Sequence, residues 1–386
     1  MKNSTTIASQ ILKIIPRNEF NKLAVKHHVG HKFRKFTRFD QFVTLLSYQM
    51  MARNGIRDIL SNLKAQSKKL YHIGFQLISR SSFSRINNEQ SYQFYEELFY
   101  KLSARCQPLS NKHKFKFKNH LYSMDASTID LCLSVFPWAK FRKNKGAVKL
   151  HTVINHDGYI PEFQTITDGK VHEVNEARKV KLPKGSILAM DRGYIDYKWF
   201  NELNNMKVFF VTRSKINMKY KVIKRNKVNK KSGVTSDQII KLTTQKGALY
   251  QGVLRRVGFK DKETGKQYYF LTNQTSLCAK TIADIYKDRW QIELFFKWIK
   301  QHLKVKKFIG ESKNAVFSQI WVAMIAYLMI SYFKWSNKIK SSEWEILQLL
   351  QVLWLNKLDA VALFKPDMEE ITSEIPQLEF EEFMGH

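Results

Sequence analysis

The segment from residue 116 to residue 213 carries the pattern that most restricts the fold. Three strand-like runs come first, and the second and third flank a turn at residues 156–158. Helical and strand-like runs then alternate, with a helix at 172–179, a strand at 186–190, a helix at 197–205 and a strand at 208–212. This order predicts a mixed α/β sheet.

An amphipathic helix is predicted for residues 282–304. Four polar side chains recur at offsets of three, seven and fourteen residues, and at about 100° per residue they share an arc of roughly 60°: Tyr286, Arg289, Glu293 and Lys300. The neighbouring arc is apolar and is expected to face a core, with Asp288 as its single intruder: Ile285, Ile292, Phe295, Phe296, Ile299 and Leu303. One acid set among cations suits a metal-dependent, phosphate-handling site if partner acids lie elsewhere.

Two aspartates are candidate partners for Glu293. Asp125 follows the strand-like run LYSM, and Asp191 closes the run SILAM. Both lie at or near the carboxyl end of a predicted strand, where open α/β sheets place ligands. Taken singly, either residue could form a turn or cap a helix. Together the three acids provide the hard oxygen ligands that Mg²⁺ prefers, on three different elements.

The charge distribution points to a polyanionic partner. The chain of 386 residues has a formal charge of +32. Residues 341–386 hold ten acids and two lysines, so the first 340 residues carry 63 basic and 23 acidic groups. A body this basic favours nucleic acid as the partner. Association with ribosomes, or charge that serves solubility alone, are the alternatives.

The chain divides into four predicted units. Residues 1–76 form a helical N-terminal DNA-binding domain with a basic, aromatic-rich loop, for which a solvated basic face is the alternative; residues 77–115 form a helical linker; residues 116–335 form the core, interrupted by a basic β-rich insertion at 214–267; and residues 336–386 form an acidic helical tail. The insertion is expected to reach toward DNA, since its first part is rich in lysine and arginine and contains no acid.

Other features limit the class of protein. The cysteines Cys106, Cys132 and Cys278 lie far apart without a CxxC pair, which argues against a zinc motif or a disulfide framework and favours the cytoplasm. Residues 315–333 are uncharged, but only 320–330 are continuously apolar, so we expect a buried core helix and no membrane association. The N-terminus has no apolar run adequate for a signal peptide.

The three acids and the helical stripe carry a family resemblance. The order Asp125, Asp191, Glu293 resembles the DDE triad of cut-and-paste transposases with a ribonuclease-H-like core. The spacing Tyr286-x2-Arg289-x3-Glu293-x6-Lys300 is similar to the YREK signature of bacterial transposases of insertion-sequence family four, at all four positions. The resemblance extends from about residue 5 to 335.

The resemblance implies a function and a site. Asp125, Asp191 and Glu293 would hold two Mg²⁺ ions, with Mn²⁺ able to substitute, and would catalyse strand cleavage and strand transfer. Double-stranded DNA, as transposon ends and as target, would be the partner, bound by a dimer at the nucleoid. Tyr286, Arg289 and Lys300 would grip the DNA end.

Several roles stay open at this stage. Lys297 and Lys304 extend the basic stripe and are candidates for contacts with the DNA backbone, whereas Trp290 and Trp298 could stack a flipped base or pack in a core. The histidines at 151, 156 and 172 are expected to be strand or turn residues rather than ligands. A ribonuclease-H-like nuclease or resolvase without joining activity, or a DNA-binding protein that has lost catalysis, are the alternatives. Terminal inverted repeats beside the gene would separate the transposase from both.

Overall fold

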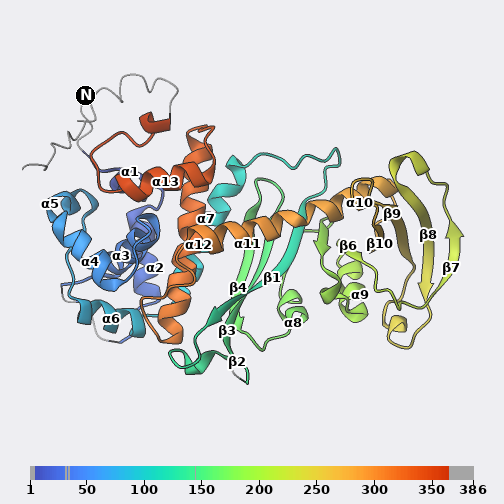
Figure 1. The fold of residues 1–386 in the computed structure, drawn as a ribbon, viewed down its shortest axis with the longest axis horizontal. Coiled ribbons are helices and arrows are strands. Elements are labelled where there is room, and N and C mark those ends of the chain that lie inside the picture. The colour runs from blue at the N-terminus through green and yellow to red at the C-terminus, as the bar shows by residue number, and fades with distance from the viewer. Residues whose placement is uncertain (1–4, 31–32, 34, 144, 365–386) are drawn as a thin grey trace, which may run out of the picture.

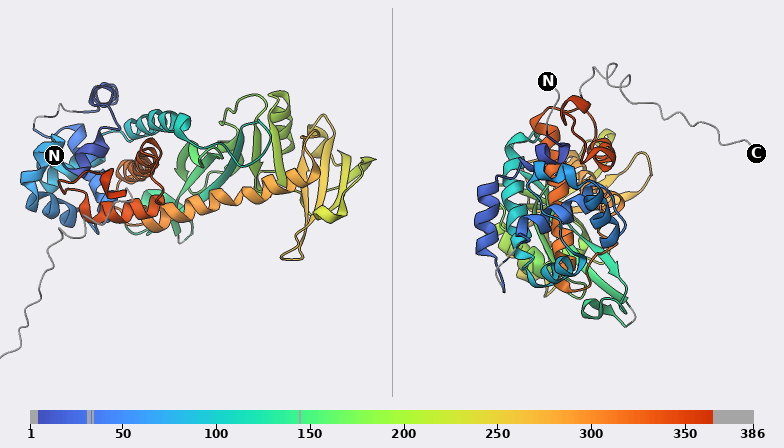
Figure 2. Two further views of the ribbon diagram at one scale, coloured as in Figure 1. Left: turned by 90° about the horizontal axis from the view of Figure 1, so that it is seen from above. Right: turned by 90° about the vertical axis from the view of Figure 1, so that its left-hand side faces the viewer.

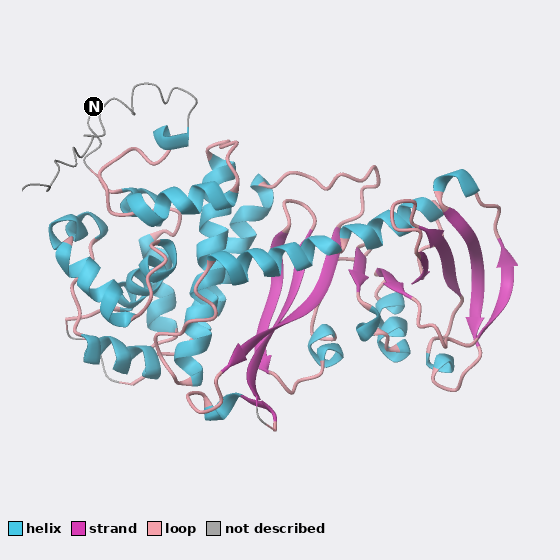
Figure 3. Ribbon diagram, in the orientation of Figure 1, coloured by secondary structure: helices cyan, strands magenta, loops and turns pink. Residues whose placement is uncertain are grey.

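The computed structural model describes residues 5–30, 33, 35–143 and 145–364. Within this part of the chain, helices gather at one end of an elongated molecule and the strands occupy the other two thirds of its length (Figure 1). Figure 3 shows the same separation by secondary structure, with a single long helical path that crosses from one part to the other.

The helical end is built around one long apolar helix, α12 (Lys313–Ser336). The helices of the N-terminal part are α1 Ile7–Leu12, α2 Arg17–Lys26, α3 Arg38–Met50, α4 Ile56–Ala65, α5 Ser67–Leu70, α6 Arg80–Glu89 and α7 Gln93–Cys106. Among them, α12 packs most closely against α3, α6 and α7. Among the described residues, α12 alone is long and apolar enough to cross a membrane, but 94% of its most apolar window is buried inside the protein. It is therefore the core helix that the sequence predicted for residues 315–333.

The core sheet has the strand order of a ribonuclease-H-like fold, and this confirms the mixed α/β prediction. Its strands are β1 Leu121–Leu131, β2 Lys140–Arg142, β3 Lys145–Asn155, β4 Ile160–Asp168, β5 Ile187–Met190 and β6 Phe209–Arg213. The order is β4-β3-β1-β5-β6: the first three strands are antiparallel, and β5 and β6 run parallel to β1. The turn predicted between the second and third long strands joins β3 to β4, and Gly158 lies in it with φ +70°.

Four further strands extend the same sheet. The basic insertion supplies β7 Tyr220–Arg225, β8 Val234–Leu242 and β9 Leu254–Lys260, and the chain returns to the core as β10 Gln267–Thr272. All four are antiparallel to their neighbours, and β10 pairs with β6, so the described strands form one ten-stranded sheet. The insertion forms the far end of the molecule from the N-terminal helices (Figure 1).

Helices cover both faces of the central strands. The short helix α8 (Glu173–Ala177) and α9 (Tyr197–Asn205) lie on one face, where Trp199 and Phe200 pack against Phe210 of β6. The helices α10 (Ala279–Asp288) and α11 (Trp290–His302) lie on the other face. Arg289 lies between them, but the helical path continues through it, since its backbone is helical at φ −52° and ψ −29°. Seen from above, this path runs along the molecule from the helical end to the insertion (Figure 2).

The first part of the predicted acidic tail belongs to the helical body. The helix α13 (Glu343–Leu353) buries Ile346, Leu347 and Leu350, and the Nε1 of Trp354 donates a 3.0 Å hydrogen bond to Ser47 Oγ of α3. The backbone amides of Ile7 and Ala8 donate to the carbonyls of Asn356 and Trp354. Residues 365–386, which hold most of the acids of that tail, lie outside the described residues.

Candidate active site

The neighbouring strands β1 and β5 bring two of the predicted acids together. The register pairs Met124 with Met190, so Asp125 and Asp191 directly follow paired residues. The strand β5 ends there, whereas β1 continues to Leu131 against β3. Asp125 therefore lies at the point where its neighbour strand stops and the sheet opens to solvent, which is where α/β sheets place ligands.

The carboxylate of Asp125 is partly buried and electrostatically disfavoured. Burial raises the pKa of Asp125 to about 6, although the Ala126 amide, which donates a 2.8 Å hydrogen bond, and the nearby Arg289 oppose the rise. The carboxylates of Glu293 and Glu173 add to the rise in pKa. Since like charges disfavour ionisation, a cation at this place would be stabilised by the cluster.

The second aspartate starts a turn. Asp191 caps a 3-10 turn at residues 192–194, where its Oδ1 accepts a 3.0 Å hydrogen bond from the Gly193 amide. The other oxygen, Oδ2, forms no hydrogen bond or ion pair within the described residues, so this side chain has capacity for a further ligand.

The third acid comes from α11, the helix that lies on one face of the sheet beside β1. Glu293 lies in the first turn of α11, and its Oε1 accepts a 2.6 Å hydrogen bond from Arg289 Nη2. The Nη1 of Arg289 lies 3.6 Å from Asp125 Oδ2. The guanidinium thus stands between two of the three acids, where it neutralises part of their charge.

Arg289 is buried with donors to spare. Its side chain is 10% exposed, and neither Nε nor Nη1 has a hydrogen-bond acceptor in the described part of the chain. Burial would lower the pKa of Arg289, but the Tyr286 ring and the carboxylates of Glu293 and Asp125 outweigh it and raise the pKa. A permanently charged fork with free donors is well matched to phosphate oxygens.

The remaining residues of the predicted stripe lie in different surroundings. Tyr286 packs its ring 5.0 Å from that of Phe270 and lines a cavity of about 400 Å³ that also reaches Asp191 and the exposed Trp290. The Nζ of Lys300 donates a 2.8 Å hydrogen bond to the Thr128 carbonyl and so ties α11 to β1.

The basic residues at the end of the stripe separate from one another. Lys297 is exposed on α11, whereas Lys304 lies beyond the end of that helix at His302. The Lys304 amide donates a 2.7 Å hydrogen bond to Gln49 Oε1 of α3. The sequence predicted a helix to residue 304, and the structure ends it two residues earlier, where the chain turns to contact the helical body. Trp298 packs against Tyr327 of α12 and is part of the core.

The three acids offer oxygen ligands that suit a divalent cation, but they are not close enough together in this arrangement to bind one. Among the described residues, no three His, Cys, Asp or Glu side chains stand close enough together to bind one ion. Arg289 occupies the space between Asp125 and Glu293 in the present arrangement. The donor set, carboxylate oxygens only, fits Mg²⁺ or Mn²⁺.

Two residues beside the acids were missed from the sequence. Glu173, the first residue of α8, raises the pKa of Asp125 and lies 3.3 Å from Lys149. Tyr194 is buried close to Asp125, Glu173 and Asp191, and its hydroxyl has no partner among the described residues. Burial, followed by the charge of these acids, raises its pKa and keeps the hydroxyl protonated. The only sequence signal for Tyr194 was its position three residues after Asp191.

A buried polar chain fixes the helix beside the site. Asp288, the charged residue in the apolar arc, accepts a 2.7 Å hydrogen bond from His156 Nδ1 and forms an ion pair with Lys114. The other ring nitrogen of His156, Nε2, lies 2.6 Å from Ser123 Oγ. Burial lowers the pKa of His156 despite Asp288, so the imidazole is neutral. Ser123 precedes Asp125 by two residues and Asp288 precedes Arg289 by one. These hydrogen bonds therefore hold β1 and the α10–α11 path together at the site. His156 is a turn residue, as predicted, and its function is structural.

Comparisons with known proteins find transposases. The family model described as "Transposase DDE domain" matches residues 117–329, and a domain of unknown function, DUF4372, matches residues 3–76. A putative transposase, y4zB of Sinorhizobium fredii, is 34% identical over 59% of this chain and 65% of its own length. The chain thus spans slightly less than two thirds of that relative.

Two further relatives are matched over more of their length. The probable transposase for insertion sequence element IS5377 of Geobacillus stearothermophilus is 25% identical over 86% of each chain. The putative transposase for insertion sequence element IS4SA of Synechocystis is 24% identical over 78% of this chain and 85% of that protein. A cryo-EM structure of the piggyBac transposase synaptic complex with hairpin DNA aligns with a TM-score of 0.47 and 11% identity, over 100% of this chain and 87% of that one. With the family model covering more than half of its residues, the chain belongs to the family of transposases that share a DDE domain.

Proposed function

We propose that this chain is the transposase of a bacterial insertion sequence and that it cuts and rejoins DNA at the ends of its element. The observation that supports this most strongly is the meeting of Asp125 and Asp191 at one edge of the sheet, with Glu293 facing them across Arg289. Three acids on three separate elements, beside a guanidinium with free donors, suit phosphoryl transfer on a polyanion.

The reaction needs no covalent intermediate with the protein. A water oxygen attacks the phosphorus at the element's end, and the DNA 3′ oxygen leaves as a hydroxyl. That hydroxyl then attacks a phosphodiester of a second strand, forming one P–O bond and breaking another. Each step forms one P–O bond and breaks another, and the proton lost by the attacking oxygen is balanced by the one that the leaving oxygen gains, so no oxidant, reductant or nucleotide cofactor is required.

Transposases with a DDE domain generally depend on a divalent metal, and we propose two Mg²⁺ ions here, with Mn²⁺ able to substitute. Asp125, Asp191 and Glu293 would hold them. The metal would lower the pKa of the attacking water and stabilise the charge on the phosphate oxygens. Tyr194 and Glu173 lie near Asp125, and the buried Tyr194 hydroxyl, which has no partner among the described residues, would donate a hydrogen bond to one of the carboxylates.

Arg289 would exchange partners when DNA binds. In the DNA-free arrangement it pairs with Glu293 and Asp125, and we propose that a phosphate of the DNA end takes over its free Nε and Nη1 donors. Tyr286, beside Asp191, would support the terminal nucleotides, and Lys297 would contact the backbone. Lys300 would act mainly by holding α11 on β1, because its ammonium already binds the Thr128 carbonyl.

The partners follow from charge and from the reaction. We propose that residues 1–76 bind the terminal inverted repeats, that the β-rich insertion contacts DNA near the cleavage point, and that two copies pair two ends as a dimer. Double-stranded DNA would serve both as element end and as target, in the cytoplasm at the nucleoid. The formal charge of +32 supports a polyanionic partner.

The test is cleavage of a duplex that carries the element's own terminal repeat, with Mg²⁺, Mn²⁺ or Ca²⁺. Cleavage is expected with the first two ions. Asp125→Asn, Asp191→Asn and Glu293→Gln should each abolish nicking while the affinity for the duplex stays within about threefold. Asp130→Asn, an exposed residue of the same strand, is the matched control and should cleave normally. Near-normal cleavage by any of the three active-site variants would refute the triad.

A further inference from the structure

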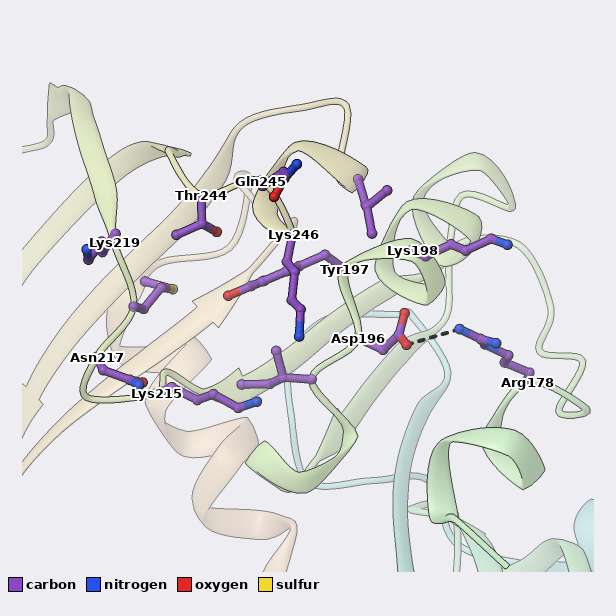
Figure 4. Close-up of a pocket in the computed structure, with 13 residues that line it drawn as sticks. Arg178, Asp196, Tyr197, Lys198, Lys215, Asn217, Lys219, Thr244, Gln245 and Lys246 are labelled. Atoms are coloured by element: carbon purple, nitrogen blue, oxygen red, sulfur yellow. Dashed lines mark hydrogen bonds and ion pairs between the residues drawn. The ribbon is translucent and has the colours of Figure 1, made fainter.

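A basic cavity of about 700 Å³ opens beside the active-site acids. Its walls come from the first residues of α9, from the loop between β6 and β7, and from the loop between β8 and β9 (Figure 4). The site described above uses none of these residues. Its volume lies within the range of ~300–1,000 Å³ that is typical of ligand pockets.

The charge of this cavity is almost entirely uncompensated. Its lining includes Arg178 and four lysines, but only one carboxylate, Asp196. That carboxylate already pairs with Arg178 at 3.0 Å. We call this cavity the lysine cleft. None of its four lysines has an ion pair within the described residues: Lys198, Lys215, Lys219 and Lys246.

Two of these lysines face the same space. In Figure 4 the side chains of Lys215 and Lys246 extend toward one another from different loops, with the Tyr197 ring beside them. Like charges brought together without a counter-charge repel each other, and an anion placed between them removes that cost. Tyr197, Asn217 and Thr244 add hydrogen-bonding groups and an aromatic face to the lining.

The lysine cleft connects to the catalytic acids. A second cavity of about 470 Å³ is lined by Asp191, Arg192 and Gly193 and shares Lys215 and Asn217 with the first. A chain of phosphates that passes Asp191 therefore reaches Lys215, which lines both cavities.

We propose that the lysine cleft binds the sugar-phosphate backbone of the DNA strand that runs past Asp191 on the side away from α11. The proposal rests on the proposed function and adds a specific DNA subsite to it. The strand has two possible sources, the DNA that flanks the element's end before cleavage, and the target DNA that the freed end attacks. Both offer the same phosphodiester chemistry, and they bind at different steps.

The binding test uses the full chain with Lys215 and Lys246 both changed to alanine. Three duplexes are compared: the element's end cut at the cleavage point, the same end with one helical turn of flanking DNA, and a target duplex added to the pre-cut end. If the flank occupies the cleft, the variant loses affinity several-fold for the flanked end alone. If the target occupies it, strand transfer falls several-fold while cleavage persists. In either case the salt dependence of binding should weaken by about two phosphate contacts.

The matched control removes the same charge from the opposite edge of the sheet. Lys184 and Lys207 are exposed and precede β5 and β6, whereas the cavities lie beyond the other ends of these strands. The double change of Lys184 and Lys207 to alanine should match the parent with all three duplexes. Changing Lys215 and Lys246 to arginine should restore most of the lost affinity, since the charge is kept. If both alanine pairs behave alike, the cleft is not a DNA site.

A footprint gives a readout that does not need catalysis. Lysine acetylation of the parent chain is measured by mass spectrometry, with and without each duplex. Lys215 and Lys246 should be protected by the flanked end or by the target, whereas Lys184 and Lys207 stay reactive. Equal acetylation of Lys215 and Lys246 in free and bound protein would overturn the inference. Protection without any cleavage by the parent chain would instead contradict the proposed function and leave the subsite standing.

Discussion

Arg289 donates a 2.6 Å hydrogen bond to Glu293, four residues further along the same helical path. The same guanidinium lies 3.6 Å from Asp125. A side chain that pairs with two candidate metal ligands competes with the metal, and one with free donors is available to phosphate. The two roles predict opposite effects of a single substitution.

Arg289→Gln should bind Mn²⁺ several-fold more tightly than the parent in the absence of DNA, because a competing cation is removed. It should cleave the element's end about 10–100-fold more slowly, since a charge-assisted phosphate contact contributes about 1.5–3 kcal/mol. Mn²⁺ binding followed by electron paramagnetic resonance, and single-turnover cleavage, measure the two effects. Unchanged metal affinity would mean that the pairing with Glu293 does not restrict the site.

The buried hydrogen bonds that end on Asp288 predict a measurable loss of stability. Asp288→Ala removes the acceptor of the neutral His156 Nδ1 and the partner of the exposed Lys114, so it should lower the free energy of unfolding by about 1–3 kcal/mol, the cost of an unsatisfied buried donor. Denaturant unfolding measures this. Asp284→Ala is the control, because Asp284 lies on the same helix, is half-exposed and pairs with Lys280; it should cost less than about 1 kcal/mol. Equal losses of stability in the two variants would show that the buried hydrogen bonds to Asp288 have no special structural role.

The three candidate acids could be proposed from the sequence because each is marked by a local pattern. Asp125 and Asp191 follow apolar strand-like runs, and Glu293 belongs to a helical repeat whose apolar arc is buried as expected. What the sequence did not disclose depends on residues far apart in the chain. The acceptor for His156 lies 132 residues away on α10, and Lys300, expected on phosphate, binds a carbonyl 172 residues earlier.

The arrangement of the insertion illustrates the same limit. Its β-rich character and its return to the core at the run YYFLTN were visible in the sequence, but the pairing of β10 with β6 was not, because the hydrogen-bonded ladder between them leaves no local pattern in either strand. The lysine cleft, which lies between loops on both sides of that junction, was invisible for the same reason.

The burial of His151 predicts that the free energy of unfolding decreases as the pH is lowered through the mildly acid range. Burial, aided by Lys149 and Lys179, lowers its pKa to about 4, whereas an unfolded histidine titrates near about 6.5. Between these values the unfolded chain binds a proton that the folded chain does not. Its contribution to stability is therefore complete above about pH 6.5 and declines by up to about 3 kcal/mol as the pH falls to about 4.

His151→Gln should flatten this dependence, since glutamine does not titrate and can still bind the Thr167 hydroxyl that lies 2.9 Å from His151 Nε2. Urea unfolding at a series of pH values measures the slope. His120→Gln, at an exposed position ahead of β1, should keep the slope of the parent. A parental slope in the His151 variant would show that other groups control the acid sensitivity.

The burial of α13 predicts that the chain beyond residue 336 contributes to the stability of the helical body. Leu350 is 1% exposed and packs in the cluster that contains α3 and α12, so Leu350→Ala should lower the free energy of unfolding by about 2–5 kcal/mol through lost burial and a residual cavity. Val352→Ala, two residues later and 76% exposed, should change it by less than about 0.5 kcal/mol. Equal stability of the two variants would mean that α13 is a detachable tail, as the acidic composition alone suggests. A large difference would make this helix an integral part of the body that carries the N-terminal helices.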